Sequence, residues 1–122
     1  MKVQESAQNY LETILILHRR HGAVRSIDIA NELAYSKASV SVAMRHLREQ
    51  ELITVDQGGY ISLLPKGAAI AEQMLERHEL ISRWLIHLGV SEETALADAC
   101  RIEHVISEES FEAMKAHAMG QK

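Results

Sequence analysis

The sequence predicts a mainly α-helical protein in two parts, and three observations carry this prediction. Apolar residues recur at three- and four-residue spacing through most of the 122 positions, which is typical of amphipathic helices. A short alternating stretch around Gly58-Gly59 instead indicates a β-hairpin. Pro65, the only proline, follows that stretch and suits the first position of a long helix. We therefore expect one domain over residues 1–64 and a second, helical domain over residues 65–122.

Composition narrows the class of protein. Hydrophobic residues make up 47% of the chain and charged residues 25%, so the chain can bury a core and is not disordered. A single cysteine cannot form an internal disulfide, which favours a reducing, cytoplasmic location. The N-terminus lacks the apolar stretch of a signal peptide, and the longest apolar run, residues 14–17, is far too short to span a membrane. We therefore expect no membrane partner.

The net charge of −4 is distributed unevenly along the chain. Residues 1–66 carry eight Lys and Arg against seven Asp and Glu, whereas residues 67–122 carry five against ten. A near-neutral front half followed by an acidic back half suggests that the two halves have different tasks.

Two helices are expected at the front of the chain. The first spans about residues 5–21 and ends at Gly22, because glycine suits the left-handed conformation that follows many helices. Ser26 is then expected to cap a short helix in the segment IDIANEL, with Asp28 in its first turn.

A tight turn at Ala34-Tyr35 leads to a third helix over about residues 37–50, which Ser36 is expected to cap. One face of this helix is apolar and should point inward: Val40, Met44 and Leu47. The opposite face should point outward: Ser39, Ser41, Arg45 and Arg48. The hairpin that follows is predicted from the alternation of Ile53 with Val55 and of Tyr60, Ser62 and Leu64.

Helix, short helix, tight turn, helix and hairpin is the order of a winged helix-turn-helix. In that fold the third helix enters the major groove of double-stranded DNA, where hydroxyl and basic side chains contact phosphates and base edges. The candidate DNA-binding residues surround this helix and the hairpin: Arg25, Ser36, Lys37, Ala38, Ser39, Ser41, Arg45, Arg48 and Gln57. The alternative is a small helical domain whose polar face is only solvated.

The back half is expected to be entirely helical. A helix from Pro65 to about Leu88 would be about 36 Å long, too long for a small domain to cover alone. It should therefore bridge two parts of the chain or pack against a second copy. Ser91 is expected to cap the next helix, and Ser107 begins a last helix that ends near Gly120.

Cys100, Glu103 and His104 stand at positions i, i+3 and i+4 of the predicted helix and share one face. A thiolate, a carboxylate and an imidazole together favour a first-row transition metal over Mg or Ca. One helix supplies three ligands at most in this way, so others must come from elsewhere. His78 on the long helix and Glu12 on the first helix are the candidates.

Simpler interpretations of these residues remain open. Cys100 could be an inert core residue in a DNA-binding protein whose back half only dimerises, or it could serve as a thiol redox sensor. Catalysis is disfavoured, because Cys100 and His104 share one helix and lack oxyanion donors or a third orienting group. The sequence also has no Gly-rich phosphate loop. We therefore expect neither an enzyme nor a small-molecule substrate.

The chain resembles the diphtheria-toxin-repressor family of iron- and manganese-dependent repressors, in its short two-domain form. The stretches that carry the resemblance are NYLETILIL, VRSIDIANEL, YSKASVSVAMRHLREQELI, RHELISRWLIHLGV and DACRIEHVIS. The resemblance implies a winged-helix DNA-binding domain, a helical dimerisation domain and a divalent-metal corepressor. It implies metal ligands at Glu12, His78, Cys100, Glu103 and His104.

Three positions depart from the family pattern. The ligand that precedes the tyrosine of the first helix falls on Asn9, which offers only a neutral carbonyl oxygen. The second metal site of the iron-responsive branch falls on Ser82 and Leu96, which puts that site in doubt.

The resemblance implies a homodimer that binds a palindromic operator when Fe(II) or Mn(II) is bound and that controls metal homeostasis. Cys100 would also accept Zn, Co or Ni.

Overall fold

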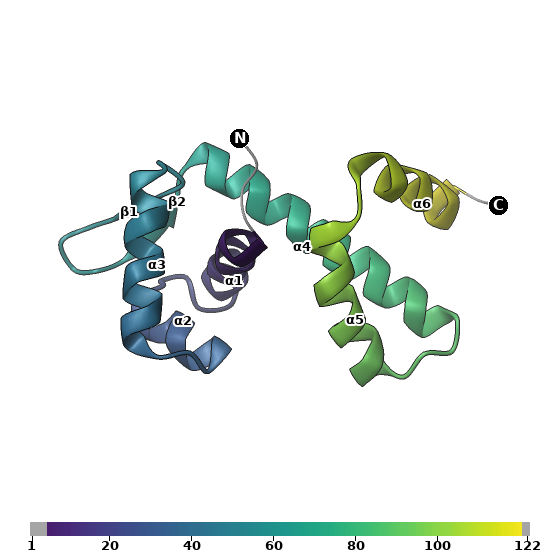
Figure 1. The fold of residues 1–122 in the computed structure, drawn as a ribbon, viewed down its shortest axis with the longest axis horizontal. Coiled ribbons are helices and arrows are strands. Elements are labelled where there is room, and N and C mark those ends of the chain that lie inside the picture. The colour runs from purple at the N-terminus through teal and green to yellow at the C-terminus, as the bar shows by residue number, and fades with distance from the viewer. Residues whose placement is uncertain (1–4, 121–122) are drawn as a thin grey trace. The chain divides into compact units, whose positions relative to one another are not determined.

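The computed structural model describes residues 5–120, which form six helices and one β-hairpin within that range. The fold is the predicted mainly helical one, with the hairpin between the third and fourth helices (Figure 1). The chain divides into two compact units, Met1–Gln73 and Met74–Lys122. Helix α4, Pro65–His87, contributes its first part to unit 1 and the rest to unit 2. None of the helices in this described range is both long enough and apolar enough to cross a membrane.

Three helices of unit 1 follow the sequence prediction closely. Helix α1 spans Glu5–His21 and ends at Gly22, which has φ +88°. Helix α2 spans Ser26–Leu33 and is followed by Ala34 in the left-handed conformation, and helix α3 spans Lys37–Glu49. These ends confirm the predicted helix stop at Gly22 and the predicted tight turn at Ala34.

The cap of α2 differs from the prediction. Arg25, not Ser26, is the N-cap, because the helix already begins at Ser26. The side chain of Asp28, in the first turn, accepts a hydrogen bond from the Arg25 backbone N–H at 2.9 Å. Ser36 does cap α3 as predicted, because its Oγ accepts from the Ser39 backbone N–H at 3.1 Å.

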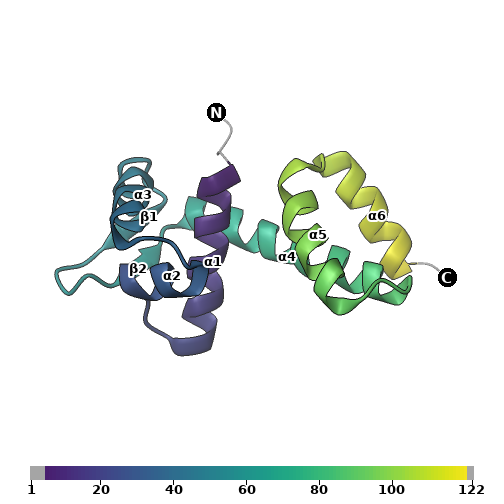
Figure 2. The ribbon, with the colours of Figure 1, turned by 60° about the horizontal axis from the view of Figure 1, so that its bottom comes forward.

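Strands β1, Ile53–Val55, and β2, Ile61–Leu63, pair in antiparallel register, with Ile53 opposite Leu63. The second strand alternates between its two faces: Tyr60 and Ser62 are exposed, and Ile61 between them is buried. Tyr60 precedes the strand and forms an isolated bridge with Arg25, outside the two strands. The loop between the strands projects outward from the unit in both views (Figures 1 and 2).

The core of unit 1 lies where the helices meet the hairpin. Its largest fully buried apolar side chains come from α1, α2, α3, both strands and the loops between them: Leu11, Ile14, Val24, Ile29, Val40, Leu52, Ile53 and Ile61. The predicted inward residues of α3, namely Val40, Met44 and Leu47, are all buried. Gly67, in the first turn of α4, lies so close to the hairpin that a Cβ atom would come within 2.1 Å of the Leu52 carbonyl oxygen. Glycine at this position therefore lets α4 begin directly against β1.

Unit 2 contains the second part of α4, helix α5 over Glu92–Val105 and helix α6 over Glu108–Gly120 (Figure 2). The predicted cap is confirmed, because Ser91 Oγ accepts from the Thr94 N–H at 3.3 Å. Ser107, where the last helix was predicted to begin, directly precedes α6, and its Oγ accepts from the Ser110 N–H at 3.0 Å. Helices α4 and α6 are joined by an ion pair between Glu76 and Lys115, which raises the pKa of Lys115.

Candidate metal centre and DNA-binding surface

Helix α5 positions the residues of the predicted metal site. Ala95, Ala99 and Glu103 form its buried face, so small alanines hold the helix close to its neighbours. Glu103 is 0% exposed, which is exceptional for a carboxylate unless it is paired. Burial of this side chain therefore needs positive charge or hydrogen-bond donors around it.

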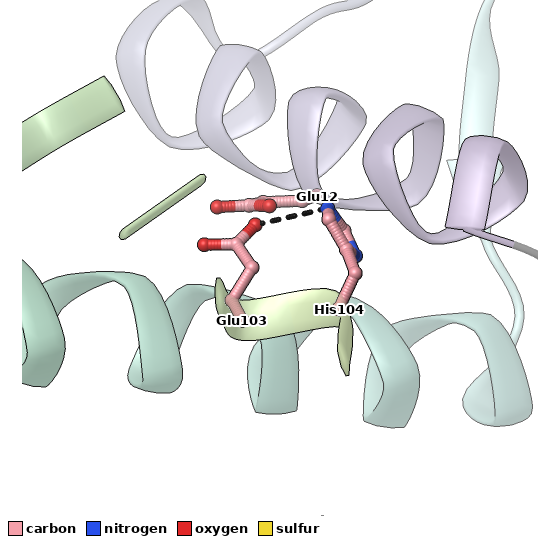
Figure 3. A group of neighbouring side chains, drawn as sticks. All are labelled: Glu12, Glu103 and His104. Atoms are coloured by element: carbon pink, nitrogen blue, oxygen red, sulfur yellow. Dashed lines mark ion pairs between the residues drawn. The ribbon is translucent and has the colours of Figure 1, made fainter. Parts of the chain in front are cut away.

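Two imidazoles flank the Glu103 carboxylate. Nδ1 of His78, on α4, lies 3.0 Å from Oε1, and Nε2 of His104, the next residue of α5, lies 3.3 Å from Oε2. Figure 3 shows Glu103 and His104 leaving consecutive positions of α5, with their ion pair dashed. The His104 side chain is only 2% exposed, whereas the His78 side chain is 24% exposed. Three of the predicted ligands therefore lie together within unit 2.

This arrangement fits a divalent transition metal. A fully buried carboxylate is costly unless a cation compensates its charge, and a divalent ion would do so. Imidazole nitrogen and carboxylate oxygen suit manganese, iron, zinc and cobalt. If Nδ1 of His78 carries the ring proton and donates it to Glu103, the other ring nitrogen keeps a lone pair for a metal.

The other predicted ligands have different surroundings. Cys100 lies on α5 one turn before Glu103 and is exposed. Glu12 lies on α1 and is buried, although it is a carboxylate. Asn9 is half-buried on α1, and its main-chain carbonyl already accepts a hydrogen bond from the Thr13 hydroxyl at 2.9 Å. Their role as ligands stays a prediction.

The position of the doubtful second site is occupied by residues without metal-binding character. Ser82 is buried and donates from its hydroxyl to the Glu79 carbonyl of its own helix at 3.3 Å. Leu96 is an exposed apolar residue on α5. These surroundings agree with the departure that the sequence indicated.

The sequence prediction missed Arg77, the residue before His78. This arginine is only 6% exposed, and its Nη1 donates to the main-chain carbonyls of Glu103 at 3.0 Å and Ile106 at 2.9 Å. No local signal could have revealed it, because an arginine on a long helix is usually solvated. Only the packing of α5 against α4 makes it an internal residue.

The predicted DNA-binding residues of α3 form an exposed surface. All of them are exposed: Ser36, Lys37, Ala38, Ser39, Ser41, Arg45 and Arg48. Ser36 and Ser39 are hydrogen-bonded to each other at 2.9 Å between their hydroxyls at the N-terminal end of the helix. That end combines free backbone N–H groups with the positive end of the helix dipole, which suits a phosphate.

Two further predicted residues lie at the hairpin and beside it. Its tip is shaped by Asp56, whose Oδ1 accepts from the backbone N–H groups of Gly58 and Tyr60, both at 2.9 Å. Gln57 is exposed at this tip. The Arg25 guanidinium lies 5.2 Å from the centre of the Tyr60 ring, which holds this exposed cation beside the hairpin.

Both halves of the chain match models of known protein families. Residues 2–60 match the iron dependent repressor N-terminal DNA binding domain, and residues 64–119 match the iron dependent repressor metal binding and dimerisation domain. The transcriptional regulator MntR of Escherichia coli O6:H1 is 33% identical over 112 residues, which are 92% of this chain and 72% of that protein.

Two solved structures share the fold. T. acidophilum IdeR superposes with a TM-score of 0.80 at 26% identity and covers 98% of this chain. A manganese-dependent transcriptional repressor in complex with manganese superposes with a TM-score of 0.80 at 28% identity and covers 90% of this chain. This chain spans only about half the length of these two solved chains, 55% and 51% respectively.

Proposed function

The chain belongs to the iron-dependent repressor family, and from this premise we propose that it represses transcription as a metal-dependent homodimer. In this proposal the dimer acts in the cytoplasm and binds a palindromic DNA operator when Fe(II) or Mn(II) is bound. It thereby regulates metal-ion homeostasis. The observation that carries the proposal is the fully buried Glu103 carboxylate between the His78 and His104 imidazoles.

We assign the metal to a centre built on these three residues. Cys100 would join them from α5, one turn before Glu103, by moving its side chain toward the ion. The family resemblance adds Glu12 and, with a neutral carbonyl oxygen, Asn9. A bound ion would supply positive charge to the buried carboxylates. It would thereby offset the unfavourable free energy of burying their negative charge and stabilise the DNA-binding form.

DNA recognition is assigned to unit 1. The exposed basic and hydroxyl residues of α3 would read the major groove, and Arg25 and Gln57 would contact the flanking backbone. The charge of the front half is close to zero, so affinity must depend on a few placed contacts and on binding by two subunits. A metal that favours the DNA-binding form typically contributes about 1–3 kcal/mol of coupling.

The test is a selection for DNA sites by the full-length protein from a pool of random duplexes, with Mn(II) or with EDTA. We expect a palindromic motif to be enriched with Mn(II) and not with EDTA. Glu103→Gln should lose this enrichment, whereas Glu93→Gln, which changes an exposed carboxylate on the same helix, should keep it. Equal enrichment of one motif in EDTA would instead identify a DNA-binding dimer without metal control.

A further inference from the structure

Arg77 is a buried cation on α4 that is not among the proposed metal ligands. Its side chain reaches from α4 to the last turn of α5, where Nη1 donates to the carbonyls of Glu103 and Ile106. The last four carbonyls of a helix have no partner within the helix, and a cation is favourable at that end. Arg77 therefore caps the C-terminus of α5 from a neighbouring helix.

The same side chain contacts the third helix of unit 2. Its guanidinium carbon lies 5.4 Å from the centre of the Phe111 ring, which is buried on α6. One arginine thus contacts side chains or backbone from both α5 and α6 while it is anchored on α4. Its planar guanidinium suits this task, because it can stack on a ring and donate hydrogen bonds in its plane.

Two adjacent residues of α4 contact Glu103, one at its main chain and the other at its side chain. Arg77 binds its main-chain carbonyl at 3.0 Å, and His78 contacts its carboxylate, with 3.0 Å between Nδ1 and Oε1. The backbone contact determines where Glu103 and His104 stand along α4. The side-chain contact determines how the carboxylate points. Because both contacts come from consecutive residues, a shift of α5 would disturb them together.

The hydrogen bonding of Arg77 is incomplete. Its Nε is buried and has no hydrogen-bond partner within the described part of the chain. An unpaired buried N–H is unfavourable, so this arginine is not the best choice for stability alone. An apolar side chain could fill the space but could not bind the two carbonyls of α5.

We propose that Arg77 is the positioning residue of the metal centre: it holds the end of α5 so that the Glu103 carboxylate, with His104 against it, faces His78. The inference rests on the proposed metal-binding function. Residues that orient metal ligands without touching the ion typically change metal affinity by about 10–100-fold when they are replaced. Arg77 acts on the backbone of one ligand and precedes another in sequence.

The experiment measures Mn(II) dissociation constants for the full-length wild type, Arg77→Met, Arg77→Lys and Arg83→Met. Arg83 is the matched control, because it is exposed on the same helix and its Nε donates within α4, to the Glu79 carbonyl at 3.4 Å. We expect Arg77→Met to weaken Mn(II) binding by about 10–100-fold. Arg77→Lys should lose less, because an ammonium keeps the charge but reaches only one carbonyl without a shift. Arg83→Met should bind as the wild type does.

A second measurement separates positioning from a general loss of stability. The absorption spectrum of Co(II) at saturation reports the geometry of the ligands around the ion in the folded protein. We expect altered bands for Arg77→Met and a spectrum closer to wild type for Arg77→Lys. If Arg77→Met does not fold, the comparison of Arg77→Lys with wild type decides the question on both measurements.

The two ideas fail in different ways. Wild-type protein that binds neither Mn(II) nor Co(II) would remove the proposed function itself. The other outcome is a wild type that binds metal and a folded Arg77 variant that has the same Mn(II) affinity and the same Co(II) spectrum. That outcome would overturn only the positioning role.

Discussion

Nδ1 of His78 lies 3.0 Å from Oε1 of Glu103, although 25 positions separate the two residues in the sequence. The contact joins α4 to α5 and places an imidazole against a carboxylate that is fully buried. Together with His104, which contacts the other carboxylate oxygen, it brings nitrogen and oxygen atoms of three predicted ligands together in unit 2.

Replacing Glu103 with Gln should abolish high-affinity metal binding and leave the fold intact. The amide has nearly the same shape and can still pair with both imidazoles, but it cannot supply negative charge to the ion. We expect Mn(II) affinity to fall by at least about 100-fold. Replacing a residue that only orients ligands lowers metal affinity by about 100-fold at most.

Calorimetry and thermal unfolding provide the measurement for Glu103→Gln. At 100 times the dissociation constant, Mn(II) should stabilise the wild type by about 2.7 kcal/mol, and the variant should show no such rise. Its metal-free Tm should stay close to that of the wild type. A variant that still gains this stabilisation would show that Glu103 is not a ligand.

Replacing Cys100 with Ser should change metal preference more than manganese affinity. A thiolate is a soft ligand that favours cobalt, zinc and iron, whereas a serine hydroxyl does not. We expect a larger loss of affinity for Co(II) than for Mn(II), and loss of the sulfur-to-metal absorption band. In the wild type Cys100 is exposed, so a maleimide should label it without metal and more slowly with metal. Equal labelling rates and an unchanged Co(II) spectrum would remove Cys100 from the ligand set.

Replacing Arg45 with Ala should weaken DNA binding without changing metal affinity. Arg45 is exposed on α3, away from the buried stripe of that helix. If it contacts a phosphate, the slope of log affinity against log salt should fall by about one. If it contacts a base, specificity at that position should relax. Titration of the selected operator at several salt concentrations distinguishes the two, and Arg83→Ala, which changes an exposed arginine in unit 2, should leave both properties unchanged.

Replacing Gly67 with Ala should destabilise unit 1. The new Cβ would come within 2.1 Å of the Leu52 carbonyl oxygen, and backbone must shift to relieve that contact. We expect a loss of about 1–3 kcal/mol in the free energy of unfolding, as for other overpacked sites. Urea unfolding provides the measurement. Ala69→Ser, two positions further along the same helix at an exposed site, should cost far less. A Gly67→Ala variant as stable as the wild type would mean that α4 can move away from β1 freely.

Much of the fold could be predicted from the sequence because the relevant signals are local. Helical periodicity, the capping hydroxyls of Ser36, Ser91 and Ser107, and the stop at Gly22 each depend on neighbours within one turn. The predictions failed where two local solutions compete. Arg25 is the N-cap of α2 where Ser26 was expected, and Asp28 accepts from the Arg25 backbone N–H.

The sequence by itself determined that Cys100, Glu103 and His104 share α5, since helical spacing alone sets the direction of each side chain. The tertiary structure decided that Glu103 is fully buried, that His78 meets its carboxylate and that Arg77 holds its backbone. The physical reason is that these contacts cross from α4 to α5. Their partners are chosen by how the two helices pack, and a long helix carries no local signal that tells an internal arginine or histidine from a solvated one.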